Sequence, residues 1–131
     1  MRIHIVCYEG VAGFRYLGEN LAMGTSAERA VEMWYSEIKD TPGGKGRVNS
    51  FNYKTGHYTQ VVWKETTKLG CGEKKGIVVC QYGKGGNMAG AFEKNVHKLD
   101  PSAKCEGNII YCSSIKSTKG RCPDWKNILL I

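Results

Sequence analysis

The sequence lacks any long run of apolar residues. Ile128–Ile131 is as long as any such run, and it is far shorter than the roughly 20 residues of a membrane-spanning helix. Heptad repeats and glycine at every third position are also absent, which excludes a coiled coil and a collagen-like helix. With 41% hydrophobic and 24% charged residues, the 131 residues have the composition and length of one globular domain.

Negative charge is in short supply. Nineteen Lys and Arg residues stand against 12 Asp and Glu residues, so the formal net charge is +7. This surplus favours anionic partners, among them an anionic membrane surface. The basic residues are scattered, and the sequence shows neither a basic stripe with interleaved aromatics nor a known nucleic-acid-binding motif. We therefore expect no nucleic-acid partner.

The first residues of the chain lack the apolar stretch and small-residue cleavage site of a secretory signal peptide. The cysteine content nevertheless favours disulfides and an oxidising compartment, because the number is even and no metal-ligand spacing is present. Free buried thiols are the alternative interpretation, and the sequence does not select among the possible pairings. The disulfide candidates are Cys7, Cys71, Cys80, Cys105, Cys112 and Cys122.

A helix is predicted to begin at Thr25. Thr25 and Glu28 match a capping box, and apolar residues then recur at helical spacing. Glu37 projects to the margin of the apolar face, where a carboxylate needs a hydrogen-bonding partner. The residues of that buried face are Ala27, Val31, Trp34 and Ile38.

Strands are predicted after this helix. Residues 57–63 alternate and are rich in β-branched and aromatic side chains, as in a half-buried strand. Residues 69–71 and 77–82 predict a hairpin around a turn at 73–76. The glycine-rich residues 10–24 are expected to form a loop. This order of elements predicts an α+β fold with an antiparallel sheet.

Several short motifs occur in a fixed order along residues 18–95. They are Gly18–Ala22 (GENLA), Trp34–Ile38 (WYSEI), Gly56–Trp63 (GHYTQVVW) followed by Leu69–Gly72 (LGCG), and Val79–Tyr82 (VCQY) followed by Gly86–Asn87. Together they resemble the CAP superfamily of cysteine-rich secretory proteins, antigen 5 and pathogenesis-related 1 proteins. The sequences of these motifs resemble most those of the Golgi-associated, pathogenesis-related-1-like branch. The resemblance implies an α-β-α sandwich, with the antiparallel sheet between helical layers.

The resemblance also divides the chain. Residues 18–100 are expected to form a partial CAP domain, preceded by an atypical segment at 1–17 that lacks the family's opening helix. The chain is therefore expected to be incomplete at its amino terminus. Residues 101–131 are expected to form a short cysteine-containing extension, with too few cysteines for the channel-blocking module of some members.

The resemblance implies a central cleft with two histidines and two glutamates. Glu19, Glu37 and His57 match three of its positions. His4 is the only histidine upstream of Glu19, and Ile5 follows it where the family has serine, so we do not expect His4 to complete the set. Two interpretations remain: weak metal binding by His57, Glu19 and Glu37, with zinc the natural ion, or a structural hydrogen-bond network without a catalytic role.

Three aromatics, Phe51, Tyr53 and Tyr58, have the spacing of the caveolin-binding pattern, and the corresponding loop of the family is linked to sterol binding. Such rings could line an apolar slot for lipid, or they could merely cap the edge of the sandwich. Cys71 and Cys80 match family positions where disulfides occur. A turn at 73–76 would make them diagonal neighbours, so bonds to other cysteines, Cys7 included, stay open.

These expectations predict a secreted, non-enzymatic CAP-domain protein that binds sterol, another lipid or a protein receptor, in defence or as a venom-like component. The rival is a metal-assisted hydrolase or protease that uses Glu19, Glu37 and His57.

Overall fold

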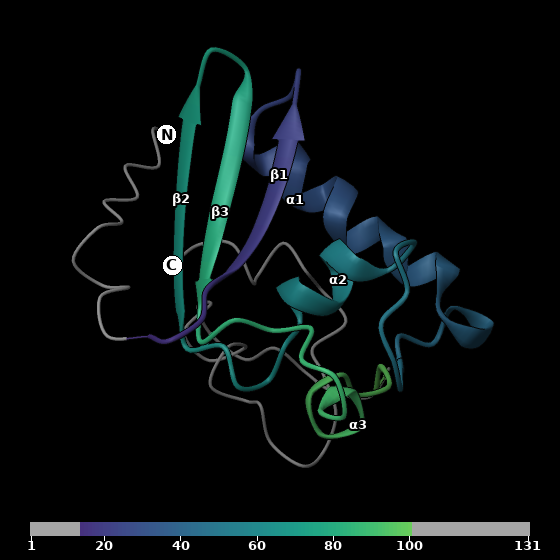
Figure 1. The fold of residues 1–131 in the computed structure, drawn as a ribbon. Coiled ribbons are helices and arrows are strands. Elements are labelled where there is room, and N and C mark those ends of the chain that lie inside the picture. The colour runs from purple at the N-terminus through teal and green to yellow at the C-terminus, as the bar shows by residue number, and fades with distance from the viewer. Residues whose placement is uncertain (1–13, 101–131) are drawn as a thin grey trace.

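The computed structural model describes residues 14–100, and it confirms the α+β fold (Figure 1). Among these residues no helix is long and apolar enough to cross a membrane. The expectations about an opening helix, His4, Cys7 and the cysteines after residue 100 lie outside the described residues. The elements are β1 (Gly18–Met23), α1 (Ala27–Ser36), η1 (Glu37–Asp40), η2 (Pro42–Gly44), α2 (Gly56–Val61), β2 (Lys68–Lys74), β3 (Ile77–Gly83) and α3 (Phe92–Asn95).

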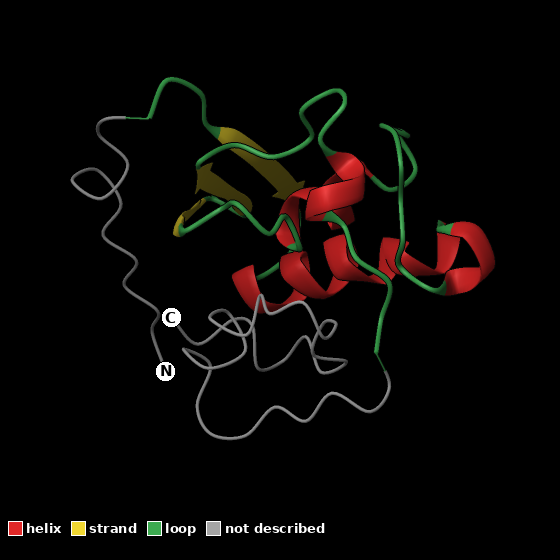
Figure 2. Cartoon of the chain, turned by 90° about the horizontal axis from the view of Figure 1, so that it is seen from below, coloured by secondary structure: helices red, strands yellow, loops and turns green. Residues whose placement is uncertain are grey.

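The sheet is antiparallel and has the order β1-β3-β2. Figures 1 and 2 show α1 running along one face of it, with α2 packed on α1 beside β1. Because successive side chains of a strand point to opposite faces, the register sorts the residues into two sets. The inner face, toward α1, carries Asn20, Ala22, Cys71, Val78, Cys80 and Tyr82, and the outer face carries Glu19, Leu21, Met23, Ile77, Val79 and Gln81.

The expectation of a loop across residues 10–24 was wrong for residues 18–23, which form β1. The inward positions of this strand are Gly18, Asn20 and Ala22, which are small or polar. An apolar alternation therefore does not show in the sequence. The strand is held instead by its ladder with β3, in which Asn20 pairs with Cys80 and Ala22 with Val78.

The predicted hairpin is confirmed, but its turn is shorter than expected. It consists of Lys75 and Gly76 alone, with φ of 51° and 72°. Two central residues with positive φ are typical of a two-residue hairpin turn, which follows the twist of the strands. This register places Cys71 directly opposite Cys80 rather than diagonally. Their Cα atoms are 4.0 Å apart, and the two sulfurs form a disulfide.

Helix α1 begins one residue later than the capping-box prediction. Ser26, not Thr25, is the N-cap, and its Oγ accepts a hydrogen bond from the Arg29 amide at 3.3 Å. Burial of Val31 and Trp34 confirms the predicted apolar face, and Trp34 is only 3% exposed. The helix therefore supplies the side chains that fill the inner face of the sheet.

The strand predicted at 57–63 was wrong, because residues 56–61 form helix α2. Three consecutive residues, Tyr58, Thr59 and Gln60, are buried, so the alternation in the sequence did not mark one buried and one exposed face. Trp63 then packs edge-on against Phe92 of α3, with ring centroids 5.0 Å apart. Tertiary packing on both sides of this segment outweighs its β-branched composition.

Candidate functional site

A carboxylate and an imidazole meet where α1 ends and α2 begins. Glu37 Oε1 lies 2.7 Å from His57 Nδ1, and Glu37 Oε2 accepts the backbone N–H groups of His57 and Tyr58 at 3.0 and 3.1 Å. The carboxylate therefore binds both the imidazole and the unpaired amides at the start of α2. His57 is thus the hydrogen-bonding partner that the sequence predicted for Glu37. The bonds from Glu37 to the two amides also explain why a helix begins at residue 56.

The environment of His57 fixes its protonation chemistry. A carboxylate only accepts hydrogen bonds, so Nδ1 carries the proton and Nε2 is the acceptor in the neutral ring. The hydrogen bond to Glu37 raises the pKa of His57, partial burial opposes the rise, and the charge of Glu37 adds to it. The Trp34 ring stacks on the imidazole with the ring centroids 6.3 Å apart, and the His57 side chain remains 45% exposed. His57 is therefore an oriented, accessible base.

Asn20 ties this pair to the sheet. Its Nδ2 donates to the His57 carbonyl and to the Tyr82 hydroxyl, each at 3.1 Å, and its side chain is buried. Sequence reasoning did not single out Asn20. The sequence did hold a signal, because Asn20 directly follows Glu19. On a strand, neighbouring side chains point to opposite faces, so only one of these two can reach the inner face.

Glu19 is the candidate that the structure does not join to this pair. It is exposed on the outer face, where its Oε2 accepts a hydrogen bond from Gln81 Nε2 at 3.2 Å. In residues 14–100 no three His, Cys, Asp or Glu side chains are grouped as metal ligands. Within that range, the donors zinc would need beyond His57 and Glu37 are not assembled, so the set does not fit a zinc site.

The three aromatics of the proposed lipid site are separated by burial. Phe51 and Tyr53 are 60% and 78% exposed, whereas Tyr58 is fully buried. The Tyr58 hydroxyl donates to the Gly46 carbonyl at 3.0 Å, and its ring packs edge-on against Tyr35. A surface lipid can therefore meet Phe51 and Tyr53, while Tyr58 stabilises the loop from inside.

Comparison with known proteins identifies the architecture. The family model described as the Cysteine-rich secretory protein family, CAP, matches residues 4–82, which is more than half of the chain. The chain belongs to this family.

Individual CAP relatives share about two fifths of the aligned residues. Scoloptoxin SSD976 of Scolopendra dehaani is 36% identical over 115 residues, covering 81% of this chain and 50% of the relative. Venom allergen 5 of Microctonus hyperodae is 38% identical over 92 residues, covering 56% and 40%. A probable pathogenesis-related protein of Candida albicans is 45% identical over 90 residues, covering 63% and 26%. The chain thus spans half or less of the length of these relatives.

The CAP motifs meet in space around α2. Gln60 Oε1 accepts the Gly86 amide at 2.7 Å, and the Thr59 hydroxyl lies 2.6 Å from Asn87 Oδ1. A Cβ on Gly86 would lie 2.8 Å from the Trp63 ring, so only glycine fits at this close approach. The sequence analysis placed these residues in the family motifs and assigned no role to them. Their role is to fasten the segment after β3 to α2, beside His57.

Proposed function

We propose that this chain is an extracellular, non-enzymatic CAP-domain protein that binds sterol or another lipid through Phe51 and Tyr53. The observation that carries the proposal is the display of two large aromatic rings in water. Transfer of such a ring out of water is favourable by about 1.5–3 kcal/mol, so the pair is suited to insert into a lipid.

The loop that holds the rings is ordered. The Asn52 side chain accepts the Lys54 amide at 2.9 Å, and the Asn52 carbonyl accepts the Thr55 amide at 3.0 Å. The Phe51 ring packs over Gly56, so closely that a Cβ added at Gly56 would lie 3.1 Å from the ring. The backbone of this loop and the Phe51 ring therefore have little conformational freedom to lose on binding, which favours affinity.

Two further observations support an extracellular setting. The Cys71–Cys80 disulfide is stable in oxidising compartments. The names of relatives, scoloptoxin and venom allergen, describe components of venom, and another relative is named as pathogenesis-related. We extend this to the chain as a role in venom or defence, with a protein receptor as the alternative partner to lipid.

Flotation with phosphatidylcholine vesicles, with and without cholesterol, tests the lipid proposal. The variant Phe51→Ala/Tyr53→Ala should bind cholesterol-containing vesicles about tenfold more weakly than the wild type. Met23→Ala/Ile77→Ala is the matched control, because it removes two exposed apolar side chains from the outer face. Equal binding by the aromatic variant and the wild type would contradict the proposal.

A hydrolase is the second candidate, and the Glu37–His57 pair is the observation that favours it. The oriented Nε2 could accept a proton from an attacking water or nucleophile. Because the described residues do not fit a metal site, we derive no metal-assisted step. Turnover of a peptide library by the wild type, lost in both Glu37→Gln and His57→Asn, would favour the enzyme over the binding protein.

A further inference from the structure

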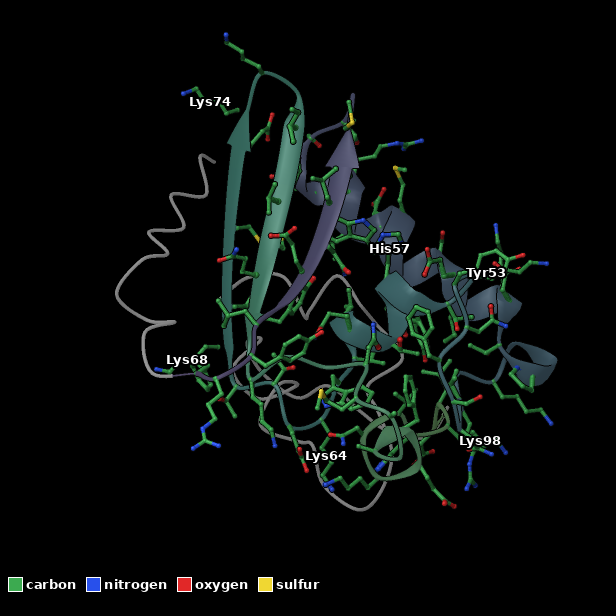
Figure 3. The ribbon with its side chains drawn as sticks, viewed as in Figure 1. Tyr53, His57, Lys64, Lys68, Lys74 and Lys98 are labelled. Carbon is green, nitrogen blue, oxygen red and sulfur yellow. A yellow bond between two sulfur atoms is a disulfide. The ribbon has the colours of Figure 1, made fainter. Side chains whose placement is uncertain are left out.

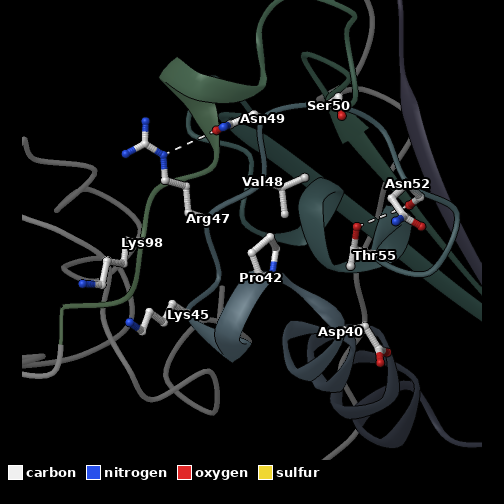
Figure 4. Close-up of a pocket in the computed structure, with 10 residues that line it drawn as sticks. All are labelled: Asp40, Pro42, Lys45, Arg47, Val48, Asn49, Ser50, Asn52, Thr55 and Lys98. Carbon is white, nitrogen blue, oxygen red and sulfur yellow. Dashed lines mark hydrogen bonds between the residues drawn. The ribbon is translucent and has the colours of Figure 1, made fainter.

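A pocket is lined by residues of η1, η2 and the loop that connects η2 to α2, and neither Glu37 nor His57 is among its lining residues. Its volume is about 420 Å³, within the range of small-molecule sites. Figure 4 shows three basic side chains, Lys45, Arg47 and Lys98, together on one side of this pocket, with Asp40 on the opposite side. The lining therefore carries three cations and one carboxylate.

The backbone that presents these cations is held in place. The Gly46 amide donates to the Thr41 hydroxyl at 2.8 Å, and the Gly46 carbonyl accepts the Tyr58 hydroxyl. Gly46 is buried between the exposed residues Lys45 and Arg47, so both flanking side chains project toward solvent from a fixed point. The Leu99 amide donates to the Lys45 carbonyl at 2.9 Å, which brings Lys98 to the same site.

The cations are only partly neutralised. Arg47 Nη2 bonds Glu93 Oε1 at 2.8 Å, and its Nε donates to Asn49 Oδ1 at 3.4 Å, which fixes the guanidinium. Within residues 14–100, neither Lys45 nor Lys98 takes part in an ion pair. Two lysines thus remain available beside a fixed arginine.

We propose that this pocket binds a phosphate-bearing anion. Three cations grouped along one rim of a concave surface match the negative charge of phosphate, and their N–H groups can donate to its oxygens. Ser50 and Asn52 also line the pocket, across from the three cations, so polar residues border it on that side too (Figure 4). The group could belong to a soluble metabolite or to a lipid headgroup, and the site does not depend on the aromatic pair proposed for lipid insertion.

Calorimetric titration with inorganic pyrophosphate tests the site. Lys45→Gln/Lys98→Gln should weaken binding about tenfold or more. Lys74→Gln/Lys75→Gln is the matched control, since it removes the same charge from the tip of the β2–β3 hairpin, and Figure 3 shows Lys74 at the opposite end of the protein from Lys98. Asp40→Asn should strengthen binding a few-fold, because it removes the negative charge that opposes the ligand.

A second arm identifies the source of the phosphate. Vesicles of phosphatidylcholine with and without phosphatidic acid are offered to the same variants. Loss of both pyrophosphate and phosphatidic acid binding in the pocket variant alone supports a headgroup site, whereas loss of pyrophosphate binding alone supports a soluble ligand. Equal weakening in the pocket and control variants, or no saturable binding by the wild type, would overturn the proposal.

Discussion

The inner and outer faces of the three-stranded sheet are built from alternating residues of the same strands, yet they carry different chemistry. On β1, Asn20 points inward to the His57 carbonyl and to Tyr82, while its neighbour Glu19 points outward to Gln81. Met23 is 71% exposed on the outer face, whereas Val78 is fully buried on the inner face. Adjacent positions in one motif therefore serve different purposes, and the inner set positions the Glu37–His57 pair.

The largest test of this contrast compares two apolar side chains. Trp34→Ala empties the space between α1 and the inner face, so it should lower the free energy of unfolding by about 3–5 kcal/mol. Met23→Ala on the outer face should change it by no more than about 0.5 kcal/mol. Urea denaturation followed by tryptophan fluorescence or circular dichroism measures both. Similar losses would show that the outer face is packed as tightly as the inner one.

The disulfide gives the next largest effect. Cys71→Ala/Cys80→Ala removes a crosslink between β2 and β3, and it should cost about 2–4 kcal/mol because the unfolded chain gains freedom. Gly72→Ala/Val79→Ala changes the adjacent, directly opposed pair on the outer face. A Cβ on Gly72 meets no atom within 4 Å, so this control should cost less than about 1 kcal/mol. Comparable destabilisation of the two variants in urea would contradict a stabilising role for the Cys71–Cys80 disulfide.

The two glutamates provide a smaller and more specific comparison. Glu37→Gln replaces the carboxylate that caps α2 with a neutral amide, whose oxygen is a weaker hydrogen-bond acceptor, and it removes the charged contact with His57. The substitution should therefore destabilise the fold by about 1–3 kcal/mol. Glu19→Gln should stay within about 0.5 kcal/mol, because its partner Gln81 lies in an exposed contact. Thermal unfolding at neutral pH distinguishes them. A Glu19→Gln loss as large as that of Glu37→Gln would place Glu19 in the network after all.

The pH dependence of stability should follow the same division, with the smallest amplitude. The pKa of folded His57 is raised above its ordinary value of 6.5 by Glu37, so protonated His57 stabilises the fold. That contribution is complete below pH 6.5 and is lost as pH rises through the higher pKa of the folded state. Glu37→Gln should abolish this slope, and Glu19→Gln should retain it. Melting temperatures measured from about pH 5.5 to about pH 8.5, in steps of about 0.5 pH unit, would show whether the two variants differ in this slope.

Part of the site could be predicted from local pattern. The helical spacing of Val31 and Trp34 identified the buried face, and it placed Glu37 at the margin where a partner was required. The alternation at 57–63 led to a strand, because a period of two cannot distinguish a half-buried strand from a short helix buried on several sides. The cap that decides for helix comes from Glu37, 20 residues away.

By itself, the sequence determined the family, the α+β class, the apolar face of α1 and the residues available for chemistry, because these depend on composition and on short-range order. Only the tertiary structure decided which of those residues meet. The two-residue turn at Lys75 and Gly76 set the register that joins Cys71 to Cys80. The alternation of β1 directed Glu19 away from the pair that Glu37 makes with His57, since a strand can offer only one of two neighbours to each face.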